Sequence, residues 1–313
     1  RATALTDNLV IITGSANQPR TYKNPFTSAE REQMIKAATG GLTLKIHIES
    51  NPDTIYNDQA WAVRVQSIVS RYRILGTRTA IIGHKKDDSS FYLDMFPQWE
   101  YVDVEEIEPL SAVNIRDLYF KRDANMNFIK AVVPQTTFVY LDAFKDTPEY
   151  EQIIKEREFV ENYKKQYASL PYPPIFSTAD TVVIQSGHVL LIKRRAEPGK
   201  GLWAMPGGYV NANTDKSVED AAIRELREET MIKVPAPVLR GNIVRSKVFD
   251  AIDRSPRGRI ITHAFFIQLP DGELPKVKGS DDAEKARWVP IAEVRSEECF
   301  EDHFEILQHF LGA

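Results

Sequence analysis

The sequence of 313 residues predicts an α/β protein with two domains: a first domain built on a parallel sheet and a second, α+β domain built on a mixed sheet. The length is about twice that of a typical domain. Strand and helix patterns alternate in the first half, and strands follow one another more closely after a proline-rich segment. We expect the first domain over 1–146, a helix and linker over 147–174, and the second domain over 175–313.

Composition narrows the class of protein. Apolar residues make up 42% and charged residues 27%, which is typical of globular chains. The net charge of −4 disfavours a general nucleic-acid binder. No apolar stretch approaches the ~20 residues that cross a bilayer, and none is typical of a signal peptide. We therefore expect a cytoplasmic protein with no nucleic-acid or membrane partner. The sequence leaves open whether the chain forms a homo-oligomer. The single cysteine, Cys299, excludes an internal disulfide and disfavours a cysteine zinc site.

The first domain begins with an alternation of short apolar runs and helical patterns. Strands are predicted at 9–13, 44–48 and 79–82, and helices at 28–38 and 58–72. In the second helix the apolar side chains recur every three or four residues. Strands separated by helices are typical of βαβ units, whose strands pair in parallel.

A long charged helix is predicted over 148–169, and a proline-rich linker follows it. Pro171, Pro173 and Pro174 cannot continue a helix and favour a stiff extended segment. The boundary between the two domains is therefore placed at this segment.

The second domain is predicted to be richer in strands. Gly187-His188 is expected to form a hairpin turn between two of them. The expected strands cover 181–185, 189–193, 243–249 and 260–269, and the expected helices cover 218–230 and 302–311. This order predicts a mixed sheet with two helices.

One helix of the second domain carries an unusual cluster of acidic side chains. Ser217 and Asp220 form a capping-box pattern, which places the helix start at Val218. Further on, Glu225, Glu228 and Glu229 fall on one face at spacings of three and four.

These three carboxylates repel one another, and they lie at the helix end where the dipole favours cations. A divalent cation would offset that repulsion, and carboxylate oxygens suit Mg²⁺. On spacing alone, a solvated acidic face remains the alternative.

The residues around the acidic run decide between these interpretations. Gly208, the run Arg224-Glu225-Leu226-Arg227-Glu228-Glu229 and Ile232 resemble the Nudix box of nucleoside-diphosphate hydrolases. Two positions depart from that pattern: Lys216 stands where the family has a glutamate, and Met231 where it has glycine. The loop after Gly208 is also two residues longer than in the family.

The resemblance implies hydrolysis of compounds in which a diphosphate links a nucleoside to another group. It implies that Glu225, Glu228 and Glu229 are both metal-binding and catalytic, with Mg²⁺ as cofactor and Mn²⁺ as an alternative. Which glutamate acts as general base stays open. The departures predict an altered loop geometry with metal binding retained.

The segment 247–263 resembles the branch of this family that acts on ADP-ribose. Arginines suit phosphate groups, although each one alone could equally be a solvated surface residue. Trp203 either packs beneath the box or stacks on adenine, and we favour packing. The residues expected to bind ADP-ribose are Arg194, Arg195, Gly207, Gly208, Arg257 and Arg259.

The first domain resembles a nicotinamide mononucleotide adenylyltransferase with a Rossmann-like fold. The complete chain resembles the bifunctional bacterial proteins that join this enzyme to a Nudix ADP-ribose pyrophosphatase. The implied substrates are ATP, nicotinamide mononucleotide and ADP-ribose. The residues expected to bind ATP or nicotinamide mononucleotide are Gly14, Ser15, Asn24, Gly83, His84, Trp99, Ser111 and Arg116.

Two features leave the first activity open. The family signature I-S-S-T-x-x-R is matched at Ser111 and Arg116, but Ala112 and Val113 replace two hydroxyl residues. The histidine motif H-x-G-H is expected upstream of Arg1, in a natural N-terminus that we take to be missing here. The alternatives are a Nudix-like regulator that senses ADP-ribose and a Nudix hydrolase with an inactive first domain.

Overall fold

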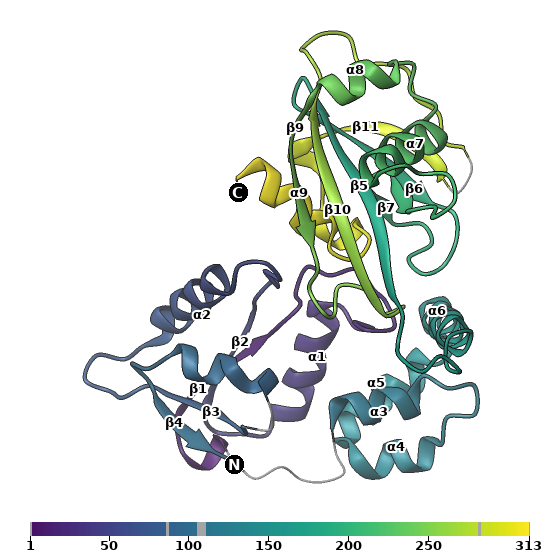
Figure 1. Cartoon of the computed structure of the whole chain (residues 1–313). Coiled ribbons are helices and arrows are strands. Elements are labelled where there is room, and N and C mark those ends of the chain that lie inside the picture. The colour runs from purple at the N-terminus through teal and green to yellow at the C-terminus, as the bar shows by residue number, and fades with distance from the viewer. Residues whose placement is uncertain (1, 86–87, 105–110, 281–282, 313) are drawn as a thin grey trace. The chain divides into compact units, whose positions relative to one another are not determined.

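The computed structural model describes residues 2–85, 88–104, 111–280 and 283–312 (Figure 1). The chain divides into two compact units. One comprises Arg1–Asn17 and Asn24–Ile154, and the other comprises Gln18–Lys23 and Lys155–Ala313. No described helix is long and apolar enough to cross a membrane.

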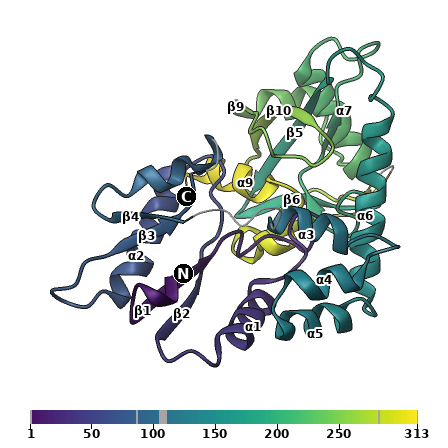
Figure 2. The ribbon, with the colours of Figure 1, turned by 90° about the horizontal axis from the view of Figure 1, so that it is seen from below.

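The strands of the first unit pair in parallel, as predicted. β1 (Asn8–Thr13) pairs with β2 (Lys45–Ser50), and Figure 2 shows the two side by side. β3 (Ala80–Gly83) pairs with β4 (Glu100–Asp103), a strand that the sequence pattern did not reveal. In the described residues these form two separate two-stranded sheets.

The predicted helices of the first unit are confirmed at nearly the expected bounds. α1 (Ser28–Thr39) begins at a capping box formed by Thr27 and Glu30. α2 (Asp58–Tyr72) buries Ala62, Val65 and Ile68 on one face. Short 3-10 turns occur at Ala2–Ala4 and Asp88–Met95.

A cluster of three further helices, α3 (Ala112–Tyr119), α4 (Met126–Val132) and α5 (Gln135–Phe144), follows. The sequence pattern predicted neither α4 nor α5. Aromatic side chains hold this part together: Tyr119 contacts Phe120 and Tyr150, with ring centroids 4.7 and 5.2 Å apart. Such non-periodic aromatic packing explains why α4 and α5 escaped a search for helical periodicity.

The second unit is built on the predicted mixed sheet. Its main strands run in the order β11-β6-β5-β10-β9, with β10 parallel to β5 and the other neighbours antiparallel. Short strands β7 and β8 pair with β6 and β5. The bounds are β5 (Ile175–Gln185), β6 (His188–Arg194), β7 (Trp203–Ala204), β8 (Gly207–Tyr209), β9 (Ile243–Phe249), β10 (Arg259–Gln268) and β11 (Ala283–Pro290).

Two boundary predictions need correction. The β5–β6 hairpin turns at Ser186 and Gly187, which have φ of 46° and 72°, so His188 already belongs to β6. Two consecutive residues with positive φ match the twist of a hairpin. The charged helix α6 (Pro148–Lys165) ends earlier than expected, because the chain turns before the prolines.

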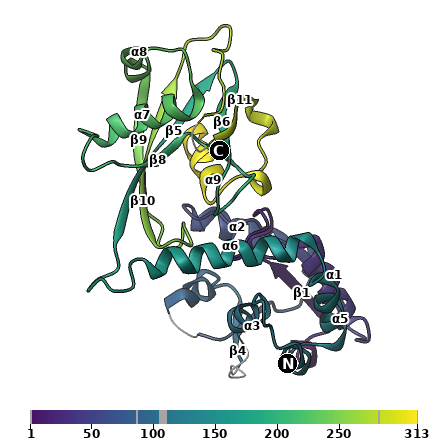
Figure 3. The same cartoon turned by 90° about the vertical axis from the view of Figure 1, so that its right-hand side faces the viewer.

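Helices cover the sheet of the second unit. α7 (Val218–Thr230) and α9 (His303–Leu311) lie on opposite faces of it (Figures 1 and 3), and α8 (Ala236–Gly241) follows α7. Short 3-10 turns at Ile291–Glu293 and Ser296–Glu298 precede α9. Ser217 caps α7 by accepting from the Asp220 amide, which confirms the predicted start.

The apolar face of α7 determines where its acidic face points. Ile223 and Leu226 are buried in a cluster with Val183, Leu190 and Ile267 of the sheet. Burying one such side chain stabilises the fold by about 1.5–3 kcal/mol. A rotation of α7 would lose this burial, so the carboxylates of the opposite face are held in place.

The end of α7 carries the unexpected Met231. Its φ of 50° lies in the left-handed region, which explains why the family pattern has glycine there. Met231 is half exposed, so little burial is lost on its removal. We expect Met231→Gly to raise the free energy of unfolding by about 1 kcal/mol.

Chemical denaturation monitored for the second unit would measure this change. Met231→Ala is the control, because alanine keeps the Cβ atom that makes this conformation costly. Equal stabilisation by both variants would contradict the backbone explanation.

Candidate active site

Arg224 organises the acidic face of α7. Its Nε donates to Asp215 Oδ1 at 2.9 Å, and its Nη2 donates to Asp215 Oδ2 at 2.8 Å. This two-point contact with Arg224 lowers the pKa of Asp215 to about 2. Asp215 directly precedes Lys216, which stands where the family pattern has a glutamate. The family pattern gives no reason to single out Asp215, whose contact with Arg224 is seen only in the folded chain.

The same guanidinium gathers two of the predicted glutamates. Arg224 Nη1 lies 2.7 Å from Glu225 Oε1 and 3.0 Å from Glu228 Oε2. These contacts, together with those to Asp215, raise the pKa of Arg224 above its usual value. One cation therefore restrains three carboxylates.

Glu229 is the buried member of the acidic set. Its side chain accepts a hydrogen bond from the Gly207 amide at 2.9 Å, and the residue is only 5% exposed. Burial raises the pKa of Glu229 to about 8, and repulsion from Glu225 and Asp180 adds to the rise. Burial also raises the pKa of Glu225.

Gly207 and Gly208 permit the close approach of strand β8 to these carboxylates. A Cβ atom on Gly208 would lie 2.6 Å from the Glu225 carboxyl carbon, and one on Gly207 would lie 2.7 Å from Asp180 Cα. A larger residue would push β8 away from β5 at Gly207 and away from α7 at Gly208. These glycines shape the site by their lack of a side chain.

The donor chemistry of the acidic face fits a divalent cation. Among the described residues, no group of three or more carboxylate, imidazole or thiol side chains is arranged to hold a metal as it stands. Glu225 and Glu228 are instead turned toward Arg224. Glu225 and Glu229 nevertheless both line one cavity, and hard carboxylate oxygens of this kind suit a divalent cation.

A cavity of about 350 Å³ adjoins this face. Of the predicted residues, its walls include Glu225, Glu229, Arg194, Arg195, Arg257, Gly207 and Gly208. Glu228 and Arg259 are not among the wall residues; Arg259 Nη2 lies 4.0 Å from Asp250 Oδ2. Trp203 packs against Arg287, whose guanidinium lies 4.3 Å from the ring centroid.

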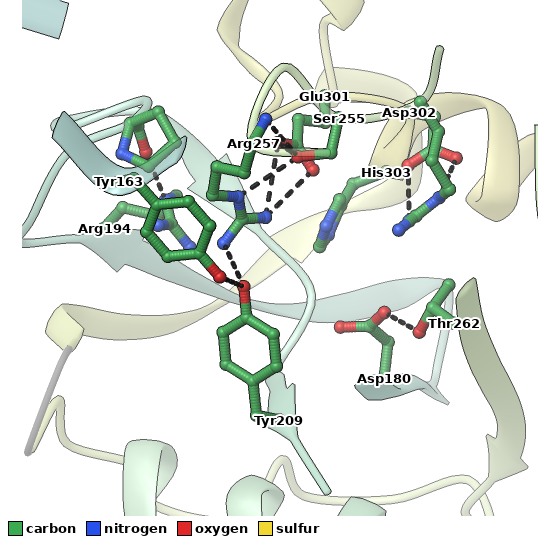
Figure 4. Close-up of polar contacts among 12 residues, drawn as sticks. Tyr163, Asp180, Arg194, Tyr209, Ser255, Arg257, Thr262, Glu301, Asp302 and His303 are labelled. Carbon is green, nitrogen blue, oxygen red and sulfur yellow. Dashed lines mark hydrogen bonds and ion pairs between the residues drawn. The ribbon is translucent and has the colours of Figure 1, made fainter. Parts of the chain in front are cut away.

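One side of the cavity combines arginines with aromatic rings. The guanidinium of Arg194 lies 3.9 Å from the centroid of the Phe300 ring, and Arg257 lies 5.6 Å from the same ring. Arg257 also donates to the Tyr209 hydroxyl at 3.5 Å, and that hydroxyl pairs with Tyr163 at 2.9 Å (Figure 4). These groups offer both positive charge and stacking surface.

The opposite side holds a buried polar cluster that the sequence did not reveal. Arg254 donates to both oxygens of Asp302, at 2.9 and 2.8 Å. Asp180 accepts from the Thr262 hydroxyl, and His303 accepts from a backbone amide. These residues are contributed by separate strands, a loop and a helix, so only the fold brings them together.

In the first unit, the predicted Gly14, Ser15 and Asn24 gather at the carboxyl end of β1. Arg31 donates to the Gly14 carbonyl at 2.6 Å and to the Ser15 carbonyl at 3.2 Å. The Ser15 hydroxyl donates to Asp53 at 2.5 Å. Such strand ends are where open α/β sheets bind ligands.

Arg116 lies close enough to affect this cluster. Burial lowers the pKa of Arg31, and the positive charge of Arg116 lowers it further against the opposing charge of Asp53. Ser111, on the same helix, is its N-cap and accepts from the Asn114 amide at 3.0 Å.

Gly83 and His84 lie together at the end of β3. The Tyr101 hydroxyl donates to the Gly83 carbonyl at 3.1 Å, and His84 Nδ1 lies 3.6 Å from Asp103. Trp99 stacks on Phe96 with ring centroids 4.5 Å apart. Within the described part of this unit, the contacts of Gly83, His84 and Trp99 are with residues other than those of the cluster around Arg31.

Comparison with known proteins finds relatives of two kinds. A family model for the NUDIX domain matches residues 176–310. The chain is 35% identical to a nicotinamide/nicotinic acid mononucleotide adenylyltransferase of Acinetobacter baylyi, over 46% of this chain and 76% of that protein. It is 34% identical to an ADP-ribose pyrophosphatase of Methanocaldococcus jannaschii, over 45% of this chain and 72% of that protein.

A solved structure matches nearly the whole chain. It is a bifunctional NMN adenylyltransferase/ADP ribose pyrophosphatase from Francisella tularensis, with 32% identity, a TM-score of 0.93, and coverage of 99% of this chain and 92% of that one. The chain belongs to this bifunctional family. A second structure from that organism, complexed with AMP and a manganese ion, matches with 30% identity, a TM-score of 0.91 and the same coverage. A divalent metal is therefore consistent with the family's acidic helix.

The raised pKa of Glu229 predicts a stability that depends on pH. A carboxyl group that titrates near 4.5 when unfolded and near 8 when folded opposes folding increasingly as the pH rises from 4.5 to 8. We expect Glu229→Gln to raise the melting temperature of the metal-free protein at pH 8, with the difference shrinking toward pH 4.5.

Differential scanning calorimetry in a chelating buffer would measure this difference. Glu219→Gln, an exposed change in the first turn of the same helix, is the matched control. Equal melting temperatures of wild type and Glu229→Gln at pH 8 would contradict the burial argument.

Proposed function

We propose that the chain is an enzyme of nicotinamide cofactor metabolism whose domains carry different activities. The domain at 175–313 hydrolyses ADP-ribose to AMP and ribose 5-phosphate with Mg²⁺, or with Mn²⁺ in its place. The domain at 1–146 transfers the adenylyl group of ATP to nicotinamide mononucleotide, which yields NAD and pyrophosphate. Residues 147–174 connect them.

One observation carries the hydrolase proposal: Glu225 and Glu229 face the same cavity as Arg194 and Arg257. A diphosphate needs positive charge along its oxygens, and arginine supplies it with directional donors. When bound to the glutamates, the divalent cation would add positive charge and a more acidic water molecule. Arg224 keeps Glu225 and Glu228 near each other.

Hydrolysis then needs little covalent participation by the protein. The oxygen of a water molecule bonds to one phosphorus, the bridging phosphorus–oxygen bond breaks, and a carboxylate takes up the proton of the water. Glu225, Glu228 and Glu229 remain the candidates for that base. The walls of the cavity orient the substrate for this in-line displacement.

The transferase proposal depends on the strand ends of the first unit. Gly14, Ser15, Asn24 and Arg116 would bind the ATP side, because the side-chain donors of an arginine and an asparagine suit phosphate oxygens. Gly83, His84 and Trp99 would bind nicotinamide mononucleotide and the adenine ring. Ser111 would act from the start of α3. Adenylyl transfer is mainly positioning with charge neutralisation, which these groups can supply.

For the hydrolase, Glu228→Gln should lower the rate of AMP release from ADP-ribose by at least about 100-fold, since it removes a proposed metal ligand. Its exposed side chain predicts no loss of stability. The rate would be followed by chromatography of AMP with Mg²⁺ present.

Glu219→Gln on the same helix serves as control and should keep the wild-type rate. Unchanged turnover by Glu228→Gln would refute its metal role. A wild-type chain that binds ADP-ribose but releases no AMP would favour the sensing regulator instead.

For the first domain, Trp99→Ala should weaken binding of nicotinamide mononucleotide about tenfold, because a cationic ring stacked on tryptophan gains about 1–2 kcal/mol. Trp99→Phe, which keeps an aromatic face, should retain most of the affinity. Fluorescence titration with nicotinamide mononucleotide measures both, and equal affinities for wild type and Trp99→Ala would exclude stacking at this position.

A further inference from the structure

His303 opens helix α9 and forms part of the cavity wall. The residue is only 7% exposed. Its Nδ1 accepts a hydrogen bond from the backbone amide of Met205 at 3.0 Å. Since a backbone amide can only donate, Nδ1 carries no proton.

The remaining ring nitrogen is therefore the protonated one. Burial lowers the pKa of His303 well below its usual value, and the positive charges of Arg254, Arg194 and Arg257 lower it further. The ring stays neutral, and Nε2 holds a fixed N–H donor. In the part of the chain that the structure describes, Nε2 has no hydrogen-bond acceptor, and the residue that carries it lines the cavity.

Two of the arginines around His303 are paired with carboxylates. Arg254 pairs with Asp302, and Arg257 lies 3.3 Å from Glu301. The Asp180 carboxylate accepts from Thr262. A neutral donor such as this N–H suits an uncharged oxygen better than a phosphate, which gains more from a charged donor.

A sugar hydroxyl has the matching chemistry. It can accept from the imidazole N–H and donate its own proton to a carboxylate. In Figure 4 the His303 ring projects into the space above the Asp180 carboxylate, so both partners are at hand.

The position of His303 within the cavity indicates which of the two riboses of ADP-ribose it would contact. Tyr163 and Tyr209 lie on the other side of the view in Figure 4, where their rings suit the base of a nucleotide. The glutamates and arginines that suit the diphosphate also line this cavity. The sugar farthest from the base would thus lie nearest to His303.

We propose that His303 donates its Nε2–H to a hydroxyl of the ribose that carries no base in ADP-ribose. It is a positioning residue that makes this site prefer a nucleoside diphosphate sugar over a plain nucleoside diphosphate. This inference rests on the proposed hydrolase function and names the part of its substrate that the α9 side of the cavity recognises.

Binding of ADP-ribose and of ADP to the full chain, measured by calorimetry in a chelating buffer, tests the proposal without turnover. His303→Asn keeps an acceptor for the Met205 amide but loses the Nε2 donor. It should weaken ADP-ribose binding about tenfold and leave ADP binding unchanged. His303→Gln, whose amide reaches the Nε2 position, should restore part of the loss.

Equal weakening of both ligands by His303→Asn, or no weakening of ADP-ribose, would overturn the proposal. Nitrogen-15 NMR of the wild type supplies a second readout: the His303 ring should show the Nε2–H tautomer throughout pH 5.5–8.5, and titration in that range would also overturn it. A wild-type chain that binds ADP-ribose without cleaving it would refute the proposed function. The comparison of ADP-ribose binding with ADP binding would still test the role of His303.

Discussion

The concentration of carboxylates around Arg224 is the interaction on which the hydrolase site depends. Glu225, Glu228 and Asp215 all contact one guanidinium, while Glu229 is buried against the Gly207 amide. Without Arg224 the carboxylates would repel one another and turn toward solvent. With it, they stay on one face, and part of their charge remains available to a divalent cation.

The rest of the second unit holds that face against the cavity. Ile223 and Leu226 anchor α7 in the core, and the absence of a side chain on Gly208 lets β8 approach within contact distance of Glu225. A shift of α7 would expose apolar area, and a shift of β8 would remove the amide that Glu229 accepts from. Packing and chemistry thus constrain the same few residues.

Local features of this fold could be predicted from the sequence, and contacts between distant segments could not. The cap at Ser217 and the strands that alternate with α1 and α2 depend on neighbours along the chain. The cluster of Asp180, Arg254 and Asp302 depends on the pairing of β5 with β10 and on the loop before α9. Asp215 escaped notice for a related reason: pattern matching tests a fixed position, whereas Arg224 needs only a carboxylate within reach.

The acidic groups of the site differ in pKa, and this difference corresponds to different roles. Asp215, with a pKa near 2, stays charged at any physiological pH and keeps Arg224 in place. Glu229, with a pKa near 8, holds a proton much of the time at neutral pH and must release it to bind a cation. Cation binding is therefore coupled to proton release, and its affinity rises with pH up to about 8. Burial disfavours the charged form of Glu229 and so destabilises the metal-free fold. The same burial strengthens cation binding, because the cation offsets repulsion between carboxylates that water does not screen.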